Sequence, residues 1–240
     1  MITVYYKKVF PLQEEDTFSQ INLSLDRDMT AHPVMKKLDK RRRERISRIK
    51  NEKARAREIT AGVLLHDALC RQMGVSPSDT PPFSFSYGER GKPYLAKRED
   101  IHFNISHSGD YVCAAVSDKP VGVDIQFREE NHIRERKVAE RFFTAADRKR
   151  LGTCAYTQYH DLFYRIWSIR ESYVKLTGEG MSGGLSGFEI DWEMGKILDT
   201  KSHNQDAFFQ ERQEIINYSL SVCAFAPQDI LWEEMEVQSL

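Results

Sequence analysis

The chain has 240 residues, of which 40% are hydrophobic and 30% charged, and its formal net charge is −1. This composition is ordinary for a globular protein and too apolar for a disordered one. A chain of this length buries a sizeable core, as one compact domain or as two halves of about 100–120 residues each. It shows neither the pattern of a secretory signal nor the roughly 18 consecutive apolar residues that span a bilayer. We therefore expect a cytoplasmic protein without a membrane partner.

Hydrophobic patterning predicts an N-terminal strand over residues 3–10 and then a long helical region over 34–73, broken near Asn51. The Gly and Pro residues of MGVSPSDTPP end that region. FSFSYGERGKPYL (83–95) then predicts two short strands around a Gly-containing turn.

Positive charge is concentrated within the predicted helical region. Residues 36–57 hold twelve Lys and Arg against three Asp and Glu. Such a run is usually a solvated helix face, but it also attracts phosphates, acidic proteins or nucleic acid. A nucleic-acid-binding module is therefore one alternative function, although no RRM, KH or zinc signature is present.

Two further strands follow the first hairpin. Residues 111–116 and 121–125 are mostly apolar and flank SDKP, so this segment predicts a second hairpin. Asp124 and Gln126 lie two apart on the second strand and project to the same face. An Asp at a strand end is often only a turn former, and His107 in ISHSG has a similar alternative as a backbone partner in a turn.

The second half of the chain repeats the plan of the first. FEIDWEMGKIL (188–198) echoes residues 83–95, and SVCAFA (221–226) echoes YVCAAV, at offsets of about 103 to 110 residues. A helix over 161–176 falls near the same offset from the helix that ends near Cys70. We therefore predict an α+β fold of two similar halves, each a helix packed on a small antiparallel sheet, with a pocket between them. The predicted boundaries of the halves are 1–119 and 120–240.

The helix DLFYRIWSIRESYVKL (161–176) has an apolar stripe at 3.6-residue spacing. Glu171 and Lys175 are four residues apart at one border of the stripe, close enough to meet. Without further context they predict a surface ion pair. Arg170 falls inside the apolar arc, so we expect it to have an acidic partner and a structural role.

Several residue types suit phosphate chemistry. The oxygens of Asp124, Gln126 and Glu171 are ligands of the kind that a hard cation such as Mg²⁺ prefers. GERGKP is not a Walker loop and by itself indicates a hairpin, with Lys92 as a candidate phosphate contact. The four cysteines lack CxxC or CxxH spacing and are expected to be buried free thiols: Cys70, Cys113, Cys154 and Cys223.

The segments GKP, FNISHSG, VGVDIQ, RFFT and FYRIWSIRESYVKLTGEGM occur in this order along the chain. Together they resemble the 4′-phosphopantetheinyl transferases of the surfactin-synthetase-activating (Sfp) type, over about residues 42–226. The resemblance implies two α/β halves with a pseudo-twofold relation. It also implies transfer of the phosphopantetheine arm of coenzyme A to a serine of an acyl or peptidyl carrier protein, with release of adenosine 3′,5′-bisphosphate.

The resemblance further implies residue roles. Asp124 and Glu171 would bind Mg²⁺, with Mn²⁺ as an alternative ion, and Glu171 would also act as a base. Lys175 would contact the pyrophosphate, and Ser106 with His107 the coenzyme's phosphates. The implied contacts to the nucleotide end and its 3′-phosphate are Lys92, Pro93, Arg42, Arg45 and Arg57.

Two departures from the family pattern stand out. Many members carry Glu where this chain has Gln126, so the third acidic ligand is replaced by a weaker amide ligand or a water. We expect activity to survive with an altered metal preference, and a catalytically silent, carrier-binding member is the second alternative. Arg170 stands where Lys is common.

The chain is expected to act as a monomer, with residues 143–160 forming part of the carrier-docking surface. The resemblance implies a carrier protein of fatty-acid, polyketide, siderophore or nonribosomal peptide synthesis.

Overall fold

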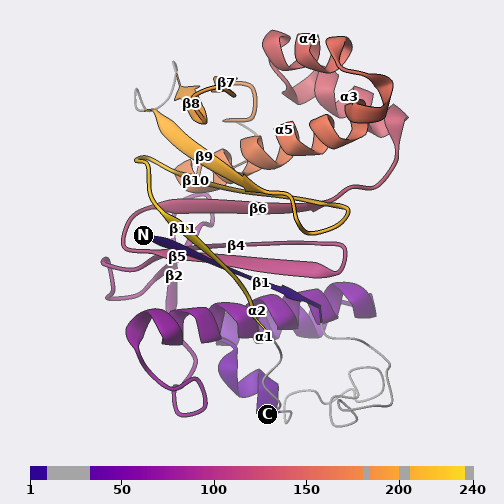
Figure 1. Ribbon diagram of the computed structural model, residues 1–240. Helices are drawn as coiled ribbons and strands as arrows, with labels where there is room; N and C mark the ends of the chain where they lie inside the picture. Colours follow the sequence, from indigo (N-terminus) through magenta and orange to yellow (C-terminus); the bar gives the residue numbers. More distant parts are fainter. Residues whose placement is uncertain (10–32, 181–183, 200–205, 236–240) are drawn as a thin grey trace.

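The computed structural model describes residues 1–9, 33–180, 184–199 and 206–235. It has four layers: an outer helix, a first sheet, a second sheet and another outer helix (Figure 1). The outer helices are α2 (Glu52–Met73) and α5 (Tyr156–Thr177). This arrangement confirms the predicted α+β class.

The first sheet has the strand order β11-β1-β5-β4. Its central pairings are antiparallel, whereas β11, the last strand of the described residues, returns to pair in parallel with β1. A short hairpin of β2 and β3 stands beside this sheet. The elements belonging to this part are β1 (Ile2–Lys8), η2 (Pro33–Lys37), α1 (Lys40–Arg48), β2 (Phe85–Tyr87), β3 (Pro93–Leu95), β4 (His102–Ser108), β5 (Tyr111–Ser117) and β11 (Ile230–Glu234).

The second sheet has the order β6-β10-β9-β8-β7 and is antiparallel throughout. Helices α3 and α4 lie beside α5 on its outer side (Figure 1). The elements of this part are β6 (Val121–Phe127), α3 (His132–Phe142), α4 (Ala145–Thr153), β7 (Phe188–Asp191), β8 (Lys196–Asp199), β9 (Ala207–Arg212) and β10 (Tyr218–Ala224).

The internal repeat appears in the strand order. The order β1-β5-β4 in the first sheet matches β6-β10-β9 in the second, and the β2–β3 hairpin corresponds to β7–β8. The covering helices α2 and α5 each have 22 residues. The prediction of two similar halves is therefore confirmed.

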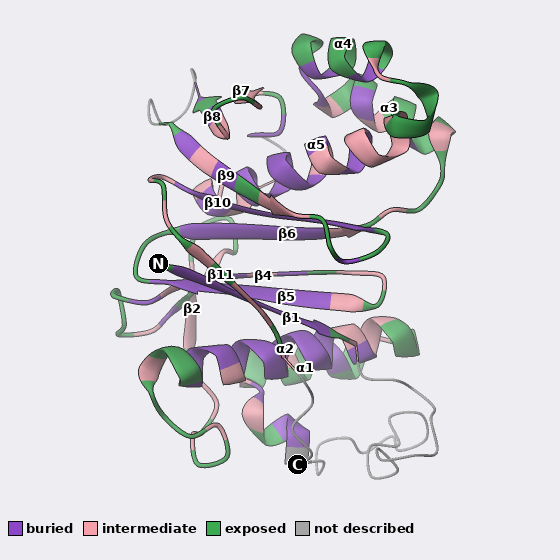
Figure 2. Cartoon of the chain, viewed as in Figure 1, coloured by how far each residue is buried: buried purple, intermediate pink, exposed green. Residues whose placement is uncertain are grey.

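Apolar contacts hold the layers together. The facing sides of the two sheets share one core cluster, which includes Val4 and Ala115 from the first sheet and Val123 and Val222 from the second. Helix α2 covers the other face of the first sheet, and α5 covers that of the second. Burial is accordingly deepest in the two middle layers (Figure 2).

The predicted second hairpin is wrong. Strand β5 belongs to the first sheet and β6 to the second, so the SDKP turn carries the chain from one layer to the next. Both strands are buried at almost every position. Without a polar face, their patterning does not distinguish a hairpin partner from a strand of the facing sheet.

Capping residues define the N-terminal helices. Asp39 caps α1, and Asn51 caps α2 by accepting the Ala54 N–H at 2.9 Å, which confirms the predicted break. The left-handed Gly74 ends α2. The predicted first strand is observed as β1, and residue 10, its expected end, lies outside the described residues.

The four cysteines are free thiols, as predicted, and only Cys154 is not fully buried. Within the described ranges, no helix is long and apolar enough to cross a membrane.

The two halves meet where β4 lies beside β6, and here side chains of β4 accept hydrogen bonds from the backbone of β6 in place of a backbone-to-backbone pairing. The Val123 N–H donates to Asn104 Oδ1 at 2.9 Å, and the Phe127 N–H donates to Ser108 Oγ at the same distance. This junction brings β4, β6 and α5 together around Asp124.

Candidate active site

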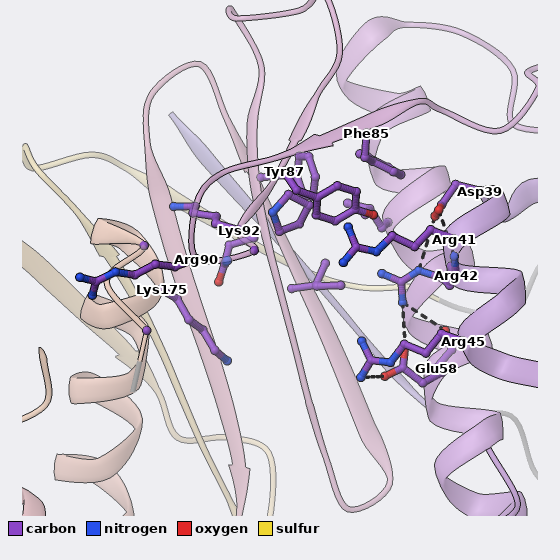
Figure 3. Close-up of a pocket in the computed structure, with 18 of the residues that line it drawn as sticks. Asp39, Arg41, Arg42, Arg45, Glu58, Phe85, Tyr87, Arg90, Lys92 and Lys175 are labelled. Atoms are coloured by element: carbon purple, nitrogen blue, oxygen red, sulfur yellow. Dashed lines mark hydrogen bonds and ion pairs between the residues drawn. The ribbon is translucent and has the colours of Figure 1, made fainter. Parts of the chain in front are cut away.

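A cavity of about 930 Å³ opens between the halves. Helix α1 and the β2–β3 hairpin form one side of it, and α5 forms the other (Figure 3). Its predicted position between the halves is confirmed. The charged residues that line it are Asp39, Arg41, Arg42, Glu44, Arg45, Arg48, Glu58, Arg90, Lys92, Glu171 and Lys175.

Asp124 lies in the middle of β6, next to the lining residue Lys175, and its side chain is only 1% exposed. Its Oδ1 accepts hydrogen bonds from Ser106 Oγ at 2.8 Å and from Lys175 Nζ at 2.6 Å. Lys175 also donates to Ser106 Oγ at 2.8 Å. Asp124 is therefore a buried acceptor shared by both halves, and its interpretation as a turn former is wrong.

The ion pair perturbs Lys175. Burial lowers the pKa of this ammonium, but the charge of Asp124 and its hydrogen bond outweigh that effect, so the pKa is raised above its ordinary value. Lys175 therefore remains a cation at the mouth of the Asp124 site.

Glu171 completes this end of the cavity. Its residue is 7% exposed, so the alternative of a surface pair with Lys175 is wrong. Burial, followed by the charge of Asp124, raises the pKa of Glu171 to about 7, and Lys175 partly opposes the shift. Two carboxylates thus repel one another in a desolvated place, which is an arrangement that a divalent cation relieves.

Gln126 lies on the same face as Asp124, as predicted, and its Nε2 donates to Asp124 Oδ2 at 2.9 Å. In the described part of the chain, no group of three or more His, Cys, Asp or Glu side chains is placed to hold a metal ion. Two carboxylates nevertheless suit Mg²⁺, which is commonly held by one or two carboxylates together with water and substrate phosphates. The residues present therefore fit this ion.

The opposite end of the cavity is basic and centres on a residue that the sequence did not single out, Glu58. Its oxygens lie 3.2 Å from Arg42 Nη1, 2.8 Å from Arg45 Nη2 and 3.3 Å from His107 Nε2. Three residues predicted to contact the coenzyme thus converge on one carboxylate (Figure 3 shows the two arginines). The sequence does contain a signal for Glu58, because it directly precedes Ile59 on the buried face of α2. A charged residue on a buried face needs a partner.

An aromatic side chain lies at the same end. The guanidinium of Arg41 stacks 3.9 Å from the ring centroid of Tyr87, and both residues line the cavity (Figure 3). Four arginines of the basic run, Arg41, Arg42, Arg45 and Arg48, face this cavity. That placement suits an anionic small molecule.

Lys92 and Pro93 line the cavity from the hairpin side. The Lys92 ammonium donates to the carbonyl oxygen of Leu176 at 2.8 Å, and Val121 O lies 3.5 Å away, so this lysine ties the hairpin to the second half. Burial lowers its pKa to about 8.

Several predicted site residues do not themselves line the cavity: Arg57, Ser106, His107, Asp124 and Gln126. Ser106 and Asp124 contact the lining residue Lys175, and His107 contacts the lining residue Glu58. The charge of Arg57 acts instead on the hydroxyl of Tyr218. The Nε of Arg57 is buried without a hydrogen-bond partner in the part of the chain that the structure describes.

Arg170 has the acidic partner that its place in the apolar arc requires. It is fully buried, and its Nε donates to Asp147 Oδ2 at 2.7 Å. It also donates to Thr144 Oγ1 and to the carbonyl oxygens of Leu185 and Phe188. This residue joins α4, α5 and the segment before β7, and so supports the helix that carries Glu171.

Comparison with known proteins gives the same family for both halves. A model described as 4′-phosphopantetheinyl transferase, N-terminal, matches residues 23–119, and the 4′-phosphopantetheinyl transferase superfamily model matches residues 120–224. The family uses coenzyme A as substrate and acts on carrier proteins.

Named relatives cover most of the chain. A 4′-phosphopantetheinyl transferase of Bacillus subtilis is 30% identical over 208 residues, covering 85% of this chain and 90% of that protein. The transferase Sfp of Bacillus subtilis strain 168 is 29% identical, covering 78% and 81%. The transferase psf-1 of Bacillus pumilus is 33% identical and covers 72% of each chain. The chain therefore belongs to the 4′-phosphopantetheinyl transferase superfamily and is an enzyme of that kind.

Proposed function

We propose that this transferase moves the 4′-phosphopantetheine arm of coenzyme A to a serine hydroxyl of an acyl or peptidyl carrier protein, with Mg²⁺ held by Asp124 and Glu171. The observation that carries this proposal is the paired buried carboxylates, which lie beside Lys175 at one end of a cavity whose other end is basic. Mn²⁺ is the alternative ion for the same oxygen ligands.

In the proposed reaction the serine oxygen forms a bond to the phosphorus that carries the pantetheine arm. The bond from this phosphorus to the bridging oxygen breaks, and adenosine 3′,5′-bisphosphate leaves with that oxygen. The serine proton passes to the carboxylate of Glu171, which lines this end of the cavity. The bound divalent ion supplies charge neutralisation at the diphosphate.

Lys175 supports the same step as a fixed cation. Its ammonium is held by Asp124 and Ser106, so it is already oriented before the diphosphate arrives. Phosphoryl transfer depends mainly on such positioning and electrostatic stabilisation. The arginines at the far end of the cavity would contact the nucleotide.

We further propose that residues 1–119 and 120–240 are the two functional halves, although β11 returns to the first sheet. The proposed protein is a monomer that binds no nucleic acid, because the cavity is already formed between its own halves and four arginines of the basic run face it. We also propose a cytoplasmic location. Residues 143–160, which include α4, are proposed to contribute to carrier docking.

The test is to incubate the purified protein with coenzyme A, Mg²⁺ and an apo carrier protein, and to measure the intact mass of the carrier. The expected result is a mass gain of one phosphopantetheine group, lost with EDTA and with a carrier in which the acceptor serine is alanine. Carrier binding without a mass gain would instead support the catalytically silent alternative. RNA retention without coenzyme A binding would support a nucleic-acid module.

A further inference from the structure

Glu58 is a fixed anion within the basic end of the cavity. Its side chain is 5% exposed and contacts residues from two other elements, α1 and β4. Burial acts to raise its pKa, but the hydrogen bond from His107 and the charges of Arg42 and Arg45 lower it overall. Glu58 is therefore ionised at neutral pH.

This carboxylate occupies donors that a bound phosphate would otherwise use. Arg42 is only 15% exposed and is held between Glu58 and Asp39, whose carboxylate lies 3.9 Å from the arginine Nε. Arg45 is 68% exposed, yet its Nη2 lies 2.8 Å from Glu58. An anion that enters this end must compete with Glu58 for the same N–H groups.

The anion that competes with Glu58 is identified by the distance of Glu58 from Glu171 and Lys175, where the diphosphate reacts. Coenzyme A reacts at its diphosphate, which the proposed function places at Glu171 and Lys175. The phosphate remaining on the nucleoside is the 3′-phosphate, and the cavity runs from Lys175 to the arginines around Glu58 (Figure 3). A 3′-phosphate carries a charge of about −1.5 to −2 at pH 7, whereas a 3′-hydroxyl is neutral and can donate to a carboxylate.

We infer that Glu58 is a specificity-determining residue that limits the preference of this pocket for the 3′-phosphorylated nucleotide over its 3′-hydroxyl form. This inference rests on the proposed function for the placement of the coenzyme. Glu58 repels the 3′-phosphate and competes for its arginines, and it accepts a hydrogen bond from a 3′-hydroxyl. Removal of the Glu58 charge should therefore raise the affinity for the 3′-phosphorylated nucleotide and not the affinity for the 3′-hydroxyl form.

The experiment measures the affinities of adenosine 3′,5′-bisphosphate and adenosine 5′-phosphate by calorimetry for the wild type and Glu58→Gln. Glutamine keeps the shape and removes the charge. We expect the bisphosphate to bind about ten-fold more tightly to the variant, the order expected for loss of a nearby, partly screened like charge. The monophosphate affinity should change by less than about two-fold. Equal changes for both nucleotides, or weaker bisphosphate binding, would overturn the inference.

Glu52→Gln is the matched control, since it removes one acid from the exposed first turn of the same helix. It should change neither affinity. If Glu58→Gln does not fold, Glu58→Asp withdraws the charge by one methylene and should raise the bisphosphate preference about three-fold; an unchanged preference would contradict the inference.

A second readout is the ratio of kcat/KM for coenzyme A to that for 3′-dephospho-coenzyme A, which cancels differences in the folded fraction. We expect Glu58→Gln to raise this ratio about ten-fold. Failure of the proposed function would abolish transfer with both substrates but would leave the nucleotide affinities measurable. The two failures are therefore distinguishable.

Discussion

Lys175, in the last turn of α5, places its Nζ 2.6 Å from Oδ1 of Asp124 on β6. The same oxygen accepts from Ser106 of the first half. One carboxylate oxygen thus joins the helix, the second sheet and the first sheet. This contact links the stability of the junction between the halves to the proposed chemistry.

Substitution of Asp124 tests this link. Asp124→Asn keeps the shape of the side chain but removes the anion that pairs with Lys175 and would hold Mg²⁺. We expect transfer to fall at least about 100-fold, the scale of losing one main electrostatic contact in the transition state. Carrier mass gain over time measures it. Asp118→Asn, at a side chain 61% exposed in the β5–β6 turn, should retain the wild-type rate. Wild-type transfer by Asp124→Asn would refute the site.

Glu171 predicts a pH-dependent stability in the metal-free protein. Because its folded-state pKa of about 7 exceeds the ordinary 4.5, the folded chain binds the proton more tightly. Its contribution is therefore fully present below about pH 4.5 and is lost as the pH rises through about 7, by at most about 3 kcal/mol. Urea unfolding at several pH values in EDTA should show this decline, and Glu171→Gln should remove it. An identical decline in the variant would contradict the assignment.

Gln126 gives a test of metal coupling. Glu in its place would direct a carboxylate at Asp124 Oδ2, where the amide now donates at 2.9 Å. We expect Gln126→Glu to lower the melting temperature in EDTA through like-charge repulsion, and to gain more thermal stability from Mg²⁺ than the wild type does. Transfer with Mg²⁺ should be maintained or increased. A large loss of transfer would show that the amide itself is required.

Arg170 predicts a large structural effect. Arg170→Met leaves Asp147 as a buried, unpaired charge and should cost about 3–5 kcal/mol in the free energy of unfolding. The free energy of unfolding of Arg170→Lys should lie between those of the wild type and Arg170→Met, because an ammonium cannot reproduce the planar set of contacts that the guanidinium makes. Denaturant titration measures both. Arg134→Ala, at a side chain 69% exposed, should change stability by less than about 0.5 kcal/mol.

Two glycines form a matched pair. A Cβ at Gly122 on β6 would overlap the Ser172 carbonyl oxygen and the Leu176 backbone nitrogen and would lie 2.9 Å from Leu176 Cα, so it would force α5 away from the sheet. Gly122→Ala should therefore lower both stability and transfer, the first by about 3 kcal/mol or more. Gly152 in α4 meets nothing within 4 Å. Gly152→Ala should stabilise the protein by about 0.5–1 kcal/mol, and equal effects of the two variants would exclude this packing argument.

Local patterns determined much of this protein from the sequence. Helical periodicity, the Asn51 cap and the Gly-containing turns fixed the helices and the β2–β3 hairpin, because these depend on neighbouring residues. The repeated segments established the two similar halves. The charge of Arg170 within an apolar arc was enough to predict a buried acidic partner.

Tertiary structure decided what depends on contacts between layers. The separation of β5 and β6 into different sheets was not readable, since both strands are buried on both faces. Arg42, Arg45 and His107 all contact Glu58, although Arg42 and His107 are 65 positions apart in the sequence. A pattern of neighbouring residues cannot predict a contact over such a separation. Tertiary packing also raises the pKa of Glu171, because burial and the charge of Asp124 act on this carboxyl only after α5 and the sheets have packed.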